Sequence, residues 1–151
     1  MKQEDKELLL KDLCARLPYG VKCNIGEKNP YTLSSVSNDY DGILIRFKEQ
    51  KNGFNMEVYL SEVKPYLFHL SSMTEEQTKE VHSLIYQGVS ESVDETKEWL
   101  KTRKENELRP ITLTYLLNFK LVIDWLNENH FDYRGLIKKG LAIDATGLNI
   151  Y

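Results

Sequence analysis

The chain contains few of the residues that fasten small domains by covalent or metal bonds. Only two of its 151 residues are cysteine, Cys14 and Cys23, and neither belongs to a Cys-x-x-Cys pair. Both lie within apolar patterns, which indicates packed thiols and a reducing compartment. The sequence therefore favours an ordinary hydrophobic core over a disulfide framework.

Long hydrophobic runs are also missing. The polar start of the chain, residues 1–6, is followed by only three consecutive leucines. That run is too short for the core of a signal peptide, and no other run approaches the length of a membrane helix. We therefore expect a cytoplasmic protein without a membrane partner.

Phosphate-binding loops and nucleophile motifs are absent as well. The eight glycines form neither a Gly-x-Gly-x-x-Gly nor a P-loop pattern, and no Gly-x-Ser-x-Gly elbow occurs. The formal net charge is −3, and the lysines and arginines are spread along the chain. Because duplex binding depends on a massed basic surface, nucleic-acid binding is unfavoured, though a nucleic-acid-binding accessory role stays an alternative. No cofactor is expected.

What is present is the composition of a globular domain. Hydrophobic residues make up 41% and charged residues 28% of the chain. A domain of this size buries roughly 68–70% of the surface that its unfolded chain exposes. We therefore expect one domain over residues 1–151, with a sheet at about 19–62 and helices at about 74–140.

The first expected element is a helix over residues 4–17. Leu10, Leu13, Cys14 and Leu17 recur at helical spacing and form one apolar stripe. Pro18 stops this helix.

The next forty residues alternate with the period of strands. The strands are expected at 21–25, 31–37, 43–47 and 54–60. Asn52-Gly53 is a strong hairpin signal. The pattern predicts a four-stranded antiparallel meander with one apolar face that needs a cover.

Helices are expected to supply that cover. They are predicted at 74–88, 92–108 and 112–129, with a short helical turn near 134–139 and a last strand or extended tail at Leu141 and Ile143. Thr74 with Gln77 is a capping box at the first of these helices. The predicted fold is α+β: an N-terminal helix, the meander, and three C-terminal helices packed on one face of the sheet.

Three separated blocks carry a resemblance to a known group of proteins. They are residues 8–22, residues 64–67 with 71–76, and above all residues 125–137 running on through 140–143. Together they resemble an uncharacterised family of small proteins found in gut bacteria and their prophages. The resemblance implies a bacterial cytosolic protein from a phage or another mobile element, and it assigns no catalytic residue.

The strongest polar cluster is the stretch 129–134, at the junction after the last long helix. His130 could act as a general base oriented by Asp132, and Arg134 could hold an anion beside Tyr133. The simpler interpretation is that these side chains cap the ends of two helices. Two potential ligands, His130 and Asp132, are too few for a metal site, so no metal is expected.

The polar helix expected at 92–108 is the second candidate. Trp99 and Leu100 are its clearest apolar anchors, and they could form the centre of an interface with a partner protein. The alternative is a solvated outer helix.

These patterns lead to three hypotheses. The first is a non-enzymatic protein-binding or regulatory module, because no reaction motif is present. The second is a small enzyme with its site at His130, Asp132 and Arg134. The third is the nucleic-acid-binding accessory protein.

Overall fold

A computed structural model describes residues 1–26, 30–39, 42–48, 55–86 and 110–151. The chain divides into two compact units. The first combines Met1–Met73 with Leu126–Tyr151, and the second is Thr74–Trp125.

The sheet of the first unit starts with a meander, as predicted. Its strands are β1 (Lys22–Asn24), β2 (Tyr31–Asp39), β3 (Gly42–Lys48) and β4 (Asn55–Tyr59). Consecutive strands pair antiparallel, and Ile45 lies opposite Val58 across β3 and β4. The alternating apolar residues thus produce the expected pairing.

Two further strands extend the sheet beyond the prediction. β5 (Lys64–Leu67) pairs antiparallel with β1, and the two-residue β6 (Ile143–Asp144) pairs parallel with β5. The strand order is β4-β3-β2-β1-β5-β6, so the sheet is mixed and has six strands. β5 was not predicted because it is short, contains Pro65 and lacks alternation, since its last three residues are all buried. Of the two alternatives predicted at Leu141 and Ile143, a strand or an extended tail, Ile143 lies in the strand β6 and Leu141 precedes it.

The N-terminal helix, α1, spans Gln3–Arg16 and is followed by the short 3-10 turn Leu17–Tyr19. Its buried residues are Leu9, Asp12, Leu13 and Arg16. The predicted apolar stripe was therefore wrong in its rotation, and Cys14, predicted as a packed thiol, is exposed. The reason is that two charged residues share the buried face, which hydropathy alone does not reveal. Cys23 is fully buried as predicted.

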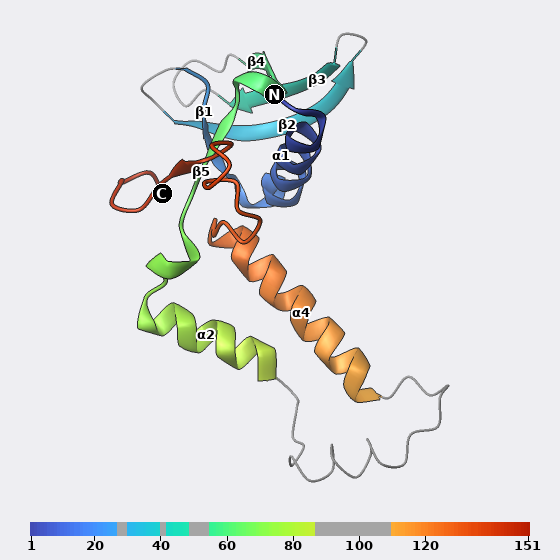
Figure 1. Ribbon diagram of the computed structural model, residues 1–151, viewed down its shortest axis with the longest axis vertical. Helices are drawn as coiled ribbons and strands as arrows, with labels where there is room; N and C mark the ends of the chain where they lie inside the picture. The colour runs from blue at the N-terminus through green and yellow to red at the C-terminus, as the bar shows by residue number, and fades with distance from the viewer. Residues whose placement is uncertain (27–29, 40–41, 49–54, 87–109) are drawn as a thin grey trace. The chain divides into compact units, whose positions relative to one another are not determined.

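The core of the first unit lies between the sheet and two covering segments. α1 lies along one face of the sheet (Figure 1) and contributes Leu9 and Leu13. The C-terminal segment contributes Leu136, Leu141 and Ala142. In the first unit α1 and the C-terminal segment thus supply the cover that we had expected from the three later helices.

The second unit contains α2 (Glu75–Tyr86) and most of α4 (Pro110–Glu128). The predicted capping box is confirmed: the Thr74 N–H donates to Gln77 Oε1 at 2.9 Å, and the Gln77 N–H donates to Thr74 Oγ1 at 3.2 Å. Asn118 Nδ2 donates to the Ile85 carbonyl oxygen at 2.9 Å and so joins α4 to α2.

Of the other two helical predictions, one cannot be compared with the structure and one is wrong. The helix expected at 92–108 lies outside the described residues. The helical turn expected near 134–139 is a series of turns, not a helix. The fold class is α+β, as predicted. Among the described residues no helix is both long enough and apolar enough to cross a membrane.

Candidate functional site

The predicted site residues begin where α4 ends. The His130 N–H donates to the Asn127 carbonyl at 3.2 Å, and the Phe131 N–H donates to the Leu126 carbonyl at 2.9 Å. This pair of bonds is a Schellman motif, which requires a left-handed residue at its turn. His130 supplies it with a φ of 58°, the one positive φ at a non-glycine residue in the described part of the chain. The backbone of His130 therefore ends a helix.

The His130 side chain is buried, with 7% of its surface exposed. Its ring stacks on Tyr151, with ring centroids 4.0 Å apart. No hydrogen-bond partner for Nδ1 is found among the described residues. Burial lowers the pKa of His130 to about 4, and the positive charges of Arg16 and Lys22 act in the same direction. At neutral pH the imidazole is therefore neutral.

Tyr151 is itself anchored in the first unit. Its hydroxyl donates to the Tyr66 carbonyl at 2.7 Å and accepts the Lys22 N–H at 3.2 Å. The Lys22 ammonium donates to the carbonyl of Ile150. Burial raises the pKa of the Tyr151 hydroxyl well above its usual value. The ring that faces His130 thus belongs to a structural anchor for the C-terminal segment.

Asp132 has different partners. Its two carboxylate oxygens accept the N–H groups of Leu136 at 2.9 Å and Ile137 at 2.8 Å. Its own N–H donates to the Phe68 carbonyl at 2.8 Å, beside β5. The carboxylate therefore ties off the backbone of the turns that follow, which is how a cap works.

Arg134 joins a cluster that the sequence did not predict. Arg134 Nη1 lies 2.9 Å from Asp12 Oδ1, and Arg16 Nε lies 2.8 Å from Asp12 Oδ2. Arg16 also donates to two carbonyls at the end of α4, those of Leu126 at 3.3 Å and Phe131 at 2.7 Å. We call Asp12, Arg16 and Arg134 the buried ion cluster.

Tyr133 completes this cluster. The Arg134 guanidinium lies 4.5 Å and the Arg16 guanidinium 5.6 Å from the centroid of its ring. Its hydroxyl donates to Asn127 Oδ1 at 3.1 Å. The ring therefore contacts both cations, as cation–π pairs require.

The three side chains of the enzyme hypothesis thus have separate partners. His130 faces Tyr151, Asp132 holds backbone N–H groups, and Arg134 pairs with Asp12. No contact joins His130 to Asp132 in the part of the chain that the structure describes. The geometry supports a structural role for all three. Trp99 and Leu100 lie outside the described residues.

Asp12 and Arg16 are the residues that sequence reasoning missed. Both side chains are fully buried. The signal was present in their spacing, because Leu9, Asp12, Leu13 and Arg16 follow the i, i+3, i+4, i+7 pattern of a buried face. An acid and a base four residues apart on such a face can be buried as a pair.

Exposed apolar side chains mark a second candidate, on α4. Leu117 is 63% and Phe119 62% exposed, followed by Leu121 at 40% and Ile123 at 36%. We call these four residues the apolar ridge. Clusters of exposed apolar side chains mark interaction sites more often than isolated ones do.

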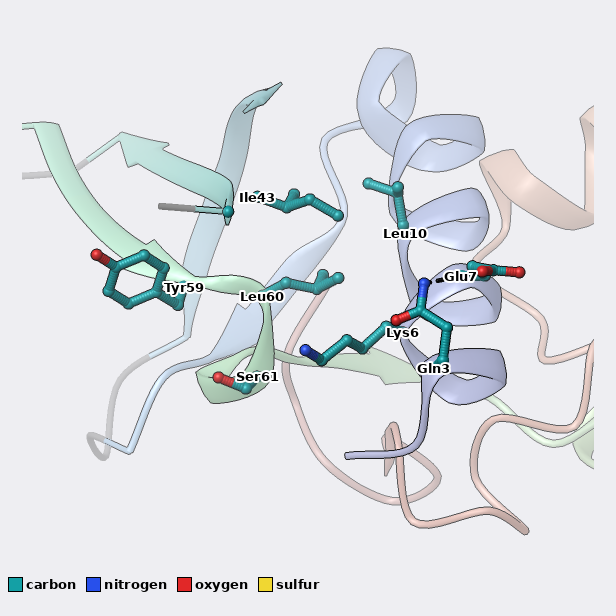
Figure 2. Close-up of a pocket in the computed structure, with 9 residues that line it drawn as sticks. Gln3, Lys6, Glu7, Leu10, Ile43, Tyr59, Leu60 and Ser61 are labelled. Carbon is teal, nitrogen blue, oxygen red and sulfur yellow. Dashed lines mark hydrogen bonds between the residues drawn. The ribbon is translucent and has the colours of Figure 1, made fainter. Parts of the chain in front are cut away.

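A groove beside α1 is the third candidate. It has a volume of about 520 Å³ and lies between α1 and the end of β4, as Figure 2 shows. The lining residues are Gln3, Lys6, Glu7, Leu10, Gly42, Ile43, Tyr59, Leu60 and Ser61. The sequence did not predict it, because its walls come from segments far apart in the chain.

Metal ligands do not gather at any of these places. Within the described ranges, no group of three or more His, Cys, Asp or Glu side chains is arranged to hold a metal ion. Comparison of the chain with protein-family profiles, with characterised proteins and with solved structures gives no match.

Proposed function

We propose that this chain is a non-enzymatic protein-binding module that docks two helices of another protein on α4. The observation that carries the proposal is the apolar ridge, where four large apolar side chains are between 36% and 63% exposed on one helix. Covering such side chains contributes roughly 25 cal/mol for each Å² removed from water. A partner that covers the ridge therefore gains binding free energy.

The spacing of the ridge fits a helical partner. Leu117 and Leu121 are four residues apart, and so are Phe119 and Ile123. Residues at this spacing lie one above the other on a helix and form a row that a second helix can pack against. At about 100° per residue, the two rows lie on nearly opposite sides of α4, so a partner that covers both contributes two helices. Phe119 is the expected central anchor, because large rings dominate the binding energy of many interfaces.

The charged residues beside the apolar rows indicate which polar residues a partner helix should carry. Lys120 and Asp124 form an ion pair on the surface that separates the two apolar rows. A partner helix should therefore combine an aliphatic face with polar residues that can meet one cation and one carboxylate. Helices with an apolar stripe beside charged residues have this character.

The setting is part of the same proposal. The resemblance to proteins of gut bacteria and their prophages supports a bacterial mobile element as the source, and hence the cytoplasm as the location. Cys14 and Cys23 are both free thiols, which is compatible with a reducing compartment.

A comparison of three baits tests the proposal. The full chain is immobilised as the wild type, as Leu117→Ser/Phe119→Ser, and as Leu148→Ser, which removes a 47% exposed leucine from the C-terminal segment of the first unit. We expect a partner that the wild type and Leu148→Ser retain and the double variant loses. With the purified partner, the double variant should raise Kd at least roughly 30-fold, as expected for a central anchor.

Two results would count against this function. The proposal is wrong if the three baits retain the same proteins or if none is retained specifically. If sedimentation instead shows that the wild type self-associates and the double variant does not, a second copy of the chain is the occupant of the ridge.

A further inference from the structure

We propose that the groove beside α1 binds a small aliphatic carboxylate. This site is separate from the apolar ridge, because every residue that lines it belongs to the first unit. The inference therefore does not depend on the protein-binding function. Its volume of about 520 Å³ falls within the roughly 300–1,000 Å³ that small-molecule sites occupy.

The floor of the groove is apolar. Leu10 from α1, Ile43 from β3 and Leu60 from the 3-10 turn Leu60–Glu62 point into the space between these segments, as Figure 2 shows. Leu60 belongs to the hydrophobic core, and Leu10 and Ile43 are partly buried against it. The groove is thus an uncovered margin of the apolar sheet face that α1 covers elsewhere. A ligand needs an apolar body to replace water there.

Two backbone groups beside the groove already have partners within the chain. The N–H of Tyr59, the last residue of β4, already donates to Glu62 Oε1 at 3.4 Å. The carbonyl of Leu60 already accepts the Val63 N–H at 3.3 Å. A peptide strand laid in the groove would leave its own polar groups without these partners, which costs free energy. An alkyl chain has no such groups, so the lining favours an acyl chain.

Among the described residues that line the groove, Lys6 is the one cation. In Figure 2 the Lys6 side chain extends from α1 toward the segment that carries Leu60 and Ser61, which line the same groove. The Glu7 carboxylate points away from the ammonium and accepts a hydrogen bond from Gln3 Nε2 at 2.9 Å. No carboxylate lies within ion-pair distance of the Lys6 ammonium among the residues with described positions.

The head group follows from this arrangement. One ammonium matches one negative charge, and the neighbouring Ser61 hydroxyl can donate a further hydrogen bond to an anionic oxygen. A phosphate head group would carry more charge than one lysine balances. The groove is therefore complementary to a monoanionic carboxylate at the end of an aliphatic chain.

Octanoate is a suitable probe, with the full-length chain observed by methyl NMR. We expect saturable shifts of the Leu10, Ile43 and Leu60 methyl groups below the micelle concentration of octanoate. 1-Octanol, which lacks the charge, should bind roughly two- to five-fold more weakly, because an exposed ion pair contributes little. Added salt should weaken octanoate binding and leave octanol binding unchanged.

A matched pair of variants tests the cation. Lys6→Met should reduce octanoate affinity to that of octanol, whereas Lys11→Met, which removes an exposed lysine from the same helix outside the groove, should not change it. The proposal is overturned if octanoate causes no saturable shifts at the three methyl groups, or if both variants have the same effect. It is also overturned if a peptide ending in leucine with a free carboxylate binds more tightly than octanoate, because the occupant would then be a protein terminus.

Discussion

The burial of side chains on helices α1 and α4 is the reverse of what the hydrophobicity of the two sequences suggests. α1 has charged residues on every side, yet Leu9 and Leu13 on it are fully buried and so are Asp12 and Arg16. α4 is the most hydrophobic part of the chain, yet Leu117 and Phe119 on it are more than 60% exposed. Hydrophobicity alone therefore does not decide which helix forms a core.

This difference shows that a side chain is buried where other groups of the protein are placed to contact it. Each polar group that α1 buries has a partner: Asp12 meets two guanidinium groups, and Arg16 also meets two carbonyls. Satisfied polar groups can be buried together with leucines. On α4 the apolar ridge has no such cover in the described part of the chain, and we interpret it as a surface for another protein.

The largest expected effect is on the buried ion cluster. Asp12→Ala leaves Arg16 buried without its carboxylate, which should lower the free energy of unfolding by about 3–5 kcal/mol. Chemical denaturation followed by circular dichroism measures it. The control is Asp5→Ala on the same helix, whose 3.4 Å ion pair with Lys139 is partly exposed and should contribute about 0.5 kcal/mol or less. Equal losses in the two variants would contradict a special role for the cluster.

The next effect compares the two helices directly. Leu13→Ala removes a fully buried side chain from α1 and should cost about 2–5 kcal/mol of unfolding free energy. Leu117→Ala makes the same change on α4, where the side chain is exposed, and should change it by about 0.5 kcal/mol or less. If Leu117→Ala is as destabilising as Leu13→Ala, the ridge is covered within the chain and the proposed docking surface is wrong.

The third effect depends on pH and concerns the end of α4. The pKa of His130 is about 4 in the folded protein and 6.5 in the unfolded chain. The unfolded state binds more protons between these values, so His130 contributes stability that is present above pH 6.5 and lost as pH falls toward 4. The free energy of unfolding should fall by up to about 3 kcal/mol over this range.

The variant His130→Asn isolates this contribution, because asparagine tolerates the left-handed conformation. From pH 6.5 to pH 4 the unfolding free energy of the wild type should fall by more than that of the variant, as measured by urea denaturation. The control is His69→Asn, which makes the same substitution at a histidine whose side chain is 48% exposed. A constant difference for His130→Asn would show that the ring is not buried neutral.

The smallest effect is on the anchor beside His130. Tyr151→Phe keeps the stacked ring but removes the hydroxyl that joins Lys22 and Tyr66, which should cost about 1 kcal/mol. Thermal unfolding measures this change. Tyr86→Phe alters an exposed ring and should leave the midpoint unchanged. An unchanged midpoint for Tyr151→Phe would mean that water replaces both hydrogen bonds.

Local patterns predicted most of the meander and several helix ends. The alternating residues located β3 and β4, and the Thr74 capping box located the start of α2. The hairpin predicted at Asn52-Gly53 lies outside the described residues. These signals act over a few residues, because turn chemistry and hydrogen bonds at a helix end depend on near neighbours. β5 and β6 were harder, since their strand character comes from pairing with distant segments.

The candidate sites also divide into features that neighbouring residues predict and features that depend on distant segments. The helix-capping interpretation of 129–134 needed only the order of polar residues around a helix end, and the Asp132 bonds agree with it. The partner of Arg134 could not be read in this way, because Asp12 lies 122 residues away. The groove has the same origin, since α1, β3 and β4 each supply part of its lining.

By itself, the sequence determined the α+β class, the antiparallel meander and the polar junction after α4, because periodicity and capping are encoded among neighbouring residues. Only the tertiary structure decided that Asp12 and Arg16 lie inside, that Cys14 and the apolar ridge lie outside, and that Lys6 stands over an apolar groove. Those outcomes depend on which distant groups meet. A buried charge requires a partner and an apolar side chain requires a cover, and neither can be located from one segment alone.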